Sequence, residues 1–104
     1  MDKDSVITLA KKYSELVSKH MPVKQVVLYG SYAKNSAGPN SDIDIAVIVE
    51  KLEGDYLDTH ARLFKLRRTI DFRIEPVLIE QGEDISGFLK DILDKGHIVY
   101  SSAM

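Results

Sequence analysis

Residues 29–49, YGSYAKNSAGPNSDIDIAVIV, constrain the fold of this chain more than any other segment. A Gly-Ser pair ends one apolar run, turn-forming residues follow, and Asp-Ile-Asp opens a second apolar run. Side chains alternate between the faces of a β-strand, so we expect Asp42 and Asp44 on one face, roughly 6.5–7 Å apart at their Cα atoms. The opposite face would then point into a core with the side chains of Ile43, Ile45, Val47 and Val49.

Two carboxylates side by side at the start of a buried strand repel each other, and a divalent cation between them would remove that repulsion. Mg²⁺ prefers oxygen ligands and keeps positions open for substrate phosphates. We therefore interpret Asp42 and Asp44 as candidate magnesium ligands. The alternative is that Asp42 caps the preceding turn and Asp44 lies on a solvated face.

The Gly30-Ser31 pair is a candidate phosphate site. A strand that runs through a glycine into a short helix or helical turn exposes backbone N–H groups, and such groups bind anions. Gly30 would let a phosphate approach the backbone, Ser31 would donate a hydrogen bond to it, and Lys34 would add positive charge one turn later. The alternative is that Ser31 only caps a helix and Gly30 only makes a turn.

A third acid is expected on a neighbouring strand. The segment 70–79, IDFRIEPVLI, alternates and then becomes wholly apolar, which predicts a strand with Asp71 and Glu75 on one face. Arg73 lies between them on the same face. Either acid could complete a metal cluster while the other pairs with Arg73. The alternative is a surface ion pair on a solvated edge, which contributes little stability.

Hydrophobic periodicity predicts alternating helices and strands, and therefore a compact α/β layer with one sheet and helices packed against it. Pro76 cannot donate to a strand ladder, so it indicates an edge strand or a bulge. Gly96 is expected to end the last helix. The predicted helices are 4–20, 30–37 (a short helix or a helical turn), 55–68 and 83–95, and the predicted strands are 24–29, 42–49, 70–79 and 97–100.

The length of 104 residues predicts a single domain spanning 1–104. A net charge of −2 argues against strong nucleic-acid binding through bulk charge. The chain has no cysteine, which excludes disulfides and thiolate metal sites. No apolar run approaches the length of a membrane span, and the N-terminus lacks a signal-type apolar block, so we expect a soluble, cytoplasmic protein without a membrane partner.

The segment GSYAKNSAGPNSDIDIAVIV resembles the signature of the DNA polymerase beta-like nucleotidyltransferase superfamily: Gly-Ser, a spacer of about ten residues, and Asp-x-Asp between apolar residues. The short length and the residues SDIDIAV resemble the minimal nucleotidyltransferases, the MNT group, and the resemblance covers residues 23–100. It implies a small mixed β-sheet flanked by helices and transfer of a nucleoside monophosphate from a nucleoside triphosphate. It also implies that Gly30 and Ser31 hold the triphosphate and that Asp42 and Asp44 bind magnesium.

The third acid of that family stands on a later strand, commonly as apolar-Asp-apolar followed by a helix. The segment RIEPVLIE fits this context with Glu75 in place of aspartate, whereas TIDF keeps the aspartate, Asp71, at an earlier position. We favour Glu75 as the third metal ligand and keep Asp71 as the alternative.

Many minimal nucleotidyltransferases act as antitoxins beside a HEPN ribonuclease toxin, by adding AMP to a tyrosine of the toxin or by binding it. The resemblance therefore implies ATP, Mg²⁺ and a HEPN-type toxin as partners. A catalytic domain this small would take its acceptor site from another subunit, or from a second copy of itself in a homodimer. Two hypotheses follow: an AMP-transferring antitoxin, or a catalytically weak or inactive module that neutralises a toxin by occlusion.

Overall fold

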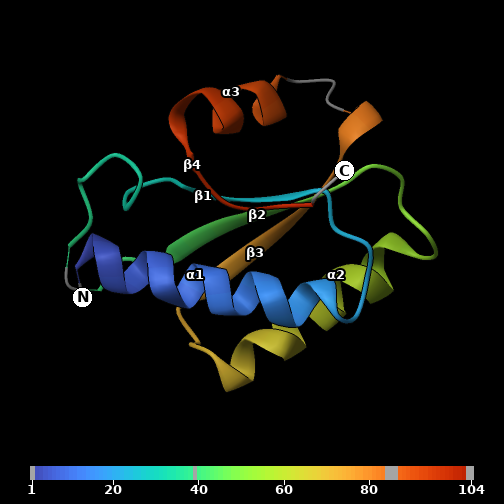
Figure 1. Ribbon diagram of the computed structural model, residues 1–104, viewed down its shortest axis with the longest axis horizontal. Helices are drawn as coiled ribbons and strands as arrows, with labels where there is room; N and C mark the ends of the chain where they lie inside the picture. The colour runs from blue at the N-terminus through green and yellow to red at the C-terminus, as the bar shows by residue number, and fades with distance from the viewer. Residues whose placement is uncertain (1, 39, 84–86, 103–104) are drawn as a thin grey trace.

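The computed structural model describes residues 2–38, 40–83 and 87–102, and these form one sheet with helices on both faces (Figure 1). The sheet order is β3-β2-β1-β4, with β2 and β3 parallel and both other pairs antiparallel. The predicted small mixed sheet flanked by helices is therefore confirmed. The elements are α1 (Lys3–Ser18), β1 (Gln25–Tyr29), β2 (Ile43–Val49), α2 (Tyr56–Leu66), the 3-10 turn η1 (Arg67–Thr69), β3 (Ile74–Glu80), the 3-10 turn η2 (Gln81–Glu83), α3 (Phe88–Lys95) and β4 (His97–Ser101).

The two faces of the sheet carry separate apolar clusters. Helices α1 and α2 cover one face, and α3 covers the other (Figure 1). The alternation predicted for β2 holds, because Ile43, Ile45, Val47 and Val49 all belong to the cluster that includes α1. The neighbouring residues Ala46 and Ile48 instead pack with Leu89 and Ile92 of α3. Any polar side chain on the second face of β2 therefore lies on the α3 side of the sheet.

Helices α1 and α2 are tied together through a buried tyrosine. The Tyr13 hydroxyl donates a 2.7 Å hydrogen bond to the carbonyl of Leu63. This satisfies a polar group that is fully buried in the core.

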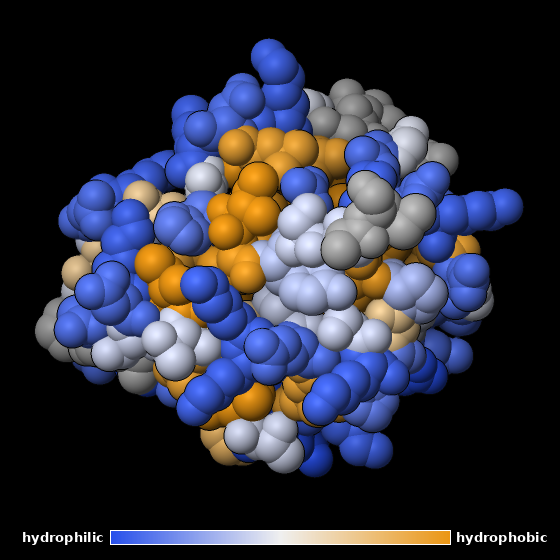
Figure 2. Space-filling model, in the orientation of Figure 1, coloured by the Kyte–Doolittle hydropathy of each residue, from blue (hydrophilic) through white to orange (hydrophobic). Residues whose placement is uncertain are grey.

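Most of the surface in the view of Figure 2 is hydrophilic, and apolar atoms gather where the sheet runs between α3 and α1. Each helix within the described residues is too short or too polar to cross a membrane.

Two of the predicted elements differ from the structure, and a third takes one of its two expected forms. Residues 31–35 form turns, and the bond from Lys34 N–H to the Gly30 carbonyl, 3.1 Å, gives a helical turn, which is one of the two forms expected for residues 30–37. Strand β3 begins at Ile74, so the prediction that Asp71 lies on this strand was wrong. Helix α3 begins at Phe88; part of the predicted start, residues 84–86, lies outside the described residues.

The outer edge of β3 is closed by side chains from the α2–η1 segment. Arg67 donates to the Ile74 carbonyl at 2.8 Å, and the Tyr56 hydroxyl donates to the Leu78 carbonyl at 3.4 Å. Backbone groups alternate sides along a strand, so residue 76 also faces outward, and there a proline has no N–H to leave unpaired. The edge position predicted from Pro76 is confirmed.

Gly96 ends α3, as predicted, but the reason is close packing. Its backbone is extended, with φ −86° and ψ 177°, which any residue can adopt. A Cβ there would lie 2.5 Å from the Ile92 carbonyl oxygen and 2.5 Å from Cγ1 of Val27. The glycine therefore lets the end of α3 approach β1.

We expect Gly96→Ala to destabilise the protein by about 1–3 kcal/mol, the usual cost of overpacking a filled site. Urea unfolding followed by circular dichroism measures this change. Gly82→Ala is the matched control, because a Cβ at Gly82 meets no atom within 4 Å. Equal stability of the two variants would contradict the packing explanation.

Candidate functional site

Three polar side chains stand in a row across the sheet on its α3 side. Asp44 is the direct partner of Tyr29 in β1 and of Glu75 in β3. Directly opposed residues of neighbouring strands project from the same face. Asp42 precedes β2 and is exposed. We call Asp42, Asp44 and Glu75 the acid edge.

The acid edge concentrates negative charge at Asp44. Burial raises the pKa of the Asp44 carboxyl, and the charges of Asp42 and Glu75 raise it further. All three causes disfavour the ionised form. The charges of the two predicted aspartates, Asp42 and Asp44, therefore repel each other, and the charge of Glu75 adds to this repulsion.

The Gly-Ser corner lies directly against this carboxylate. Gly30 has φ +71°, in the left-handed region that favours glycine, and a Cβ at this position would overlap Oδ2 of Asp44. The predicted phosphate corner and the predicted acidic pair therefore converge at one place. No helix follows Gly30 directly, so any anion binding here would depend on turn N–H groups and side chains, without a helix dipole.

Asp71 and Glu75 have different surroundings. Arg73 donates to Asp71 through Nε at 3.0 Å and Nη2 at 2.8 Å, and the Arg73 backbone N–H bonds Asp71 Oδ1 at 2.8 Å. The Arg73 hydrogen bond lowers the pKa of Asp71. Glu75 stands beside Asp44 instead. The structure thus places Glu75 in the row, where it also has a longer ion pair of 3.4 Å with Arg67, and Asp71 outside the row in a 2.8 Å ion pair with Arg73.

Arg67 is a site residue that the sequence did not single out. Its Nη1 lies 3.4 Å from Oε1 of Glu75, and its guanidinium stacks 4.8 Å from the centroid of the Phe64 ring. In the sequence it belongs to a basic run on the predicted third helix, with no signal that separates it from its neighbours. Only the fold, which ends α2 beside β3, brings this cation to the acid edge.

Tyr29 is a second site residue to which the sequence analysis assigned no role. Burial raises the pKa of its hydroxyl, and the charges of Asp44 and Glu75 raise it further. Its ring meets Phe88 of α3 edge-on, with centroids 5.8 Å apart. The sequence alone does not place Tyr29 opposite Asp44, because this position depends on how β1 pairs with β2.

The acid edge fits magnesium that is shared with a nucleotide. Within residues 2–38, 40–83 and 87–102, no three acidic or histidine side chains are close enough to form a metal site by themselves. Mg²⁺ commonly uses one or two carboxylates and takes its other ligands from water and substrate phosphates. The mutual repulsion at Asp44 is the property that a cation would relieve. Asp42 and Asp44, with Glu75 beside them, therefore supply a suitable donor set.

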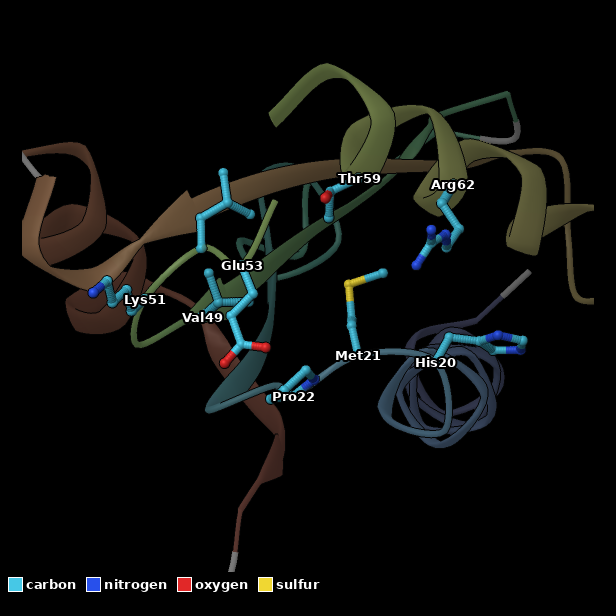
Figure 3. Close-up of a pocket in the computed structure, with 9 residues that line it drawn as sticks. His20, Met21, Pro22, Val49, Lys51, Glu53, Thr59 and Arg62 are labelled. Carbon is cyan, nitrogen blue, oxygen red and sulfur yellow. The ribbon is translucent and has the colours of Figure 1, made fainter. Parts of the chain in front are cut away.

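A pocket of about 250 Å³ opens beside Gly30. We call it the corner pocket; it is lined by Tyr29, Gly30, Lys34, Phe88, Asp91, Ile92 and Lys95. A second pocket, of about 200 Å³, lies at the opposite end of β2, where Met21 and Arg62 point toward each other (Figure 3). It includes Val49, which is about 16 Å along the strand from Asp44. None of the predicted site residues lines it.

Comparison with known proteins identifies one family. Residues 11–103 match the family described as Polymerase beta, Nucleotidyltransferase. No curated protein sequence matches the chain. The match covers the corner, the acid edge and both candidate third acids.

Solved structures share this fold at low sequence identity. A protein from Sulfolobus solfataricus, provisionally described as a nucleotidyltransferase, has a TM-score of 0.70 and 21% identity, covering 95% of this chain and 83% of that one. A toxin-antitoxin complex with AMP-PNP has a TM-score of 0.68 and 22% identity, covering 88% and 73%. A tri-AMPylated Shewanella oneidensis HEPN toxin in complex with its MNT antitoxin has a TM-score of 0.64 and 21% identity, covering 91% and 71%.

We expect Asp44→Asn to stabilise the metal-free protein at neutral pH. The native pKa of Asp44 is raised, so between the unfolded and native pKa values the folded state binds more protons. Stability from this group is therefore greatest at low pH and falls as the pH rises through that window. The substitution should raise Tm by a few degrees at pH 7, since 1 kcal/mol corresponds to roughly 4–8 °C in a small domain. The gain in Tm should disappear at pH values below both the unfolded and the native pKa of Asp44.

Thermal unfolding at several pH values in EDTA measures this effect. Glu15→Gln is the control, because it removes an exposed carboxylate from α1. A Tm for Asp44→Asn at or below that of the wild type at pH 7 would refute the repulsion at the acid edge.

We expect Gly30→Ala to be more damaging than Gly87→Ala. Both glycines have similar positive φ values, 71° and 77°, so an alanine adds comparable backbone strain. Only at Gly30 would the new methyl collide with Asp44; at Gly87 no atom lies within 4 Å. The additional loss of unfolding free energy should be about 1–3 kcal/mol. Chemical denaturation of both variants measures these losses. Equal losses of unfolding free energy in the two variants would contradict a collision between the new methyl and Asp44.

Proposed function

The chain belongs to the polymerase beta nucleotidyltransferase family, and from this premise we propose that it transfers AMP from ATP to a hydroxyl group of a HEPN-type toxin and so acts as an antitoxin. The observation that carries the proposal is the contact between the Gly30 backbone and the Asp44 carboxylate. A phosphate at the corner would lie next to the carboxylates that bind its metal ion. This is the arrangement that transfer of a nucleotidyl group requires.

The glycine corner would hold the phosphates of ATP. Gly30 has no side chain to block the backbone, and the Ser31 hydroxyl and the Lys34 ammonium can both donate to phosphate oxygens. Lys34 is exposed and lines the corner pocket, so it can reach a ligand bound there. These residues would bind and orient the polyphosphate chain.

Asp42, Asp44 and Glu75 would hold magnesium. When bound, the ion would neutralise charge on the phosphates and on the leaving pyrophosphate. Glu75 is our candidate for the third acid because it pairs with Asp44 across the parallel strands. Asp71 is engaged by both the side chain and the backbone of Arg73, which favours a structural role at the turn before β3.

The transfer step would take place beside the acid edge. The acceptor hydroxyl oxygen would form a bond to the α-phosphorus of ATP, and the bond from that phosphorus to the bridging oxygen would break. Pyrophosphate would leave with the electron pair. The hydroxyl proton would pass to a carboxylate of the site and then to water. Alignment of the two reactants contributes much of the rate in such a step.

The partner is inferred from the structural neighbours. Their descriptions record toxin-antitoxin complexes, one with AMP-PNP and one with an AMPylated HEPN toxin. Occlusion of the toxin without transfer is the second candidate function. Glutamate in place of the expected aspartate at position 75, and its ion pair with Arg67, favour that alternative.

Incubation of the protein with labelled ATP, Mg²⁺ and a HEPN-type protein from the same organism tests the proposal. We expect label to accumulate on the toxin, and its mass to increase by one or more adenylyl groups. Asp44→Asn should lower the rate by about 100-fold or more, a typical loss when one transition-state charge contact is removed. Light scattering on the same samples would give the stoichiometry of the complex and reveal a homodimer.

Glu75→Gln and Asp71→Asn form a matched pair in this assay, because each removes one candidate third acid. We expect the first to reduce transfer strongly and the second to leave it close to the wild-type rate. The reverse order would assign the role to Asp71. Full neutralisation of the toxin by Asp44→Asn, with no label transferred by the wild type, would establish occlusion instead.

A further inference from the structure

We propose that the corner pocket is the nucleobase subsite, so that the ring system of the nucleotide lies between β1 and α3. This inference rests on the proposed function. It adds the part of the molecule that distinguishes a nucleotide from inorganic polyphosphate.

The walls of the pocket suit a flat aromatic ring. Tyr29 and Phe88 meet edge-to-face at an interplanar angle of 87°, and Phe88 remains 41% exposed. Ile92 supplies a buried apolar surface beside them. An aromatic ring that is half open to solvent is a suitable stacking partner for a base, since every base has a π-face.

The position of the pocket matches the path of one nucleotide. Gly30 and Lys34 line both the pocket and the phosphate corner. Tyr29 lies in the pocket and is also the strand partner of Asp44. A nucleotide with its phosphates at Gly30 and the acid edge therefore has an adjoining pocket for its other end. The pocket in Figure 3 lies at the far end of β2 and is unsuited to this role.

The size and the rim of the pocket fit one ring system. Its volume of about 250 Å³ is below the ~300–1,000 Å³ of sites that enclose whole drug-sized ligands. Lys95 and Asp91 form a 2.9 Å ion pair at the rim, and both side chains are more than half exposed. They offer a donor and an acceptor to the polar edge of a base, while the stacking surface stays apolar.

Titration calorimetry of two probes, ATP and inorganic tripolyphosphate, each with Mg²⁺, tests the proposal. Phe88→Ala should weaken ATP binding by about 5- to 150-fold, the range for losing one base–aromatic stack. Its affinity for tripolyphosphate should stay within about two-fold of the wild type, because that probe has no base to stack. Phe72→Ala is the control, since Phe72 is 67% exposed and does not line the pocket.

The outcomes separate this inference from the proposed function. Unchanged ATP affinity in Phe88→Ala, or equal losses for both probes, would overturn the subsite and leave the proposed function standing. A wild-type protein that binds neither probe would overturn both. If Phe88→Ala does not fold, Phe88→Leu keeps an apolar side chain and removes the ring, and the same comparison applies to it.

Discussion

The contact between the Gly30 backbone and the Asp44 carboxylate is the constraint on which the candidate site depends. It requires a residue without a Cβ directly after β1, because a Cβ there would overlap the carboxylate. The same contact helps to bury Asp44, whose charge is already opposed by Asp42 and Glu75. A carboxylate held where its ionised form is disfavoured costs stability, and perturbed carboxylates of this kind cluster at functional sites.

The crossover between β2 and β3 accounts for the rest of the acid edge. Parallel strands need a long connection, and here α2 and η1 supply it. The resulting register sets Glu75 beside Asp44, and the end of the crossover brings Arg67 to Glu75. One connection therefore places both an acid and its counter-ion at the site.

The sequence was sufficient to predict the alternation of β2 and the edge position of Pro76, because both follow from local rules. It was not sufficient to place Asp71. This side chain binds the backbone N–H of Arg73 and so stabilises a turn where periodicity alone indicated a strand. Nor could it place Arg67, since its contact with Glu75 depends on how α2 packs against β3. The pairing of Asp44 with Glu75 likewise depends on a register that neither strand encodes alone.

The closed edge of β3 has a consequence for assembly. Tyr56, Pro76 and Arg67 leave little there for an incoming chain to bond, since two carbonyls are engaged and one N–H does not exist. Growth of this sheet by strand addition, whether by another protein or by aggregation, is thereby directed to β4 at the other margin. A toxin or a second copy that extended the sheet from β4 would be separated from the acid edge by β4 and β1, and would leave the approach to the carboxylates open.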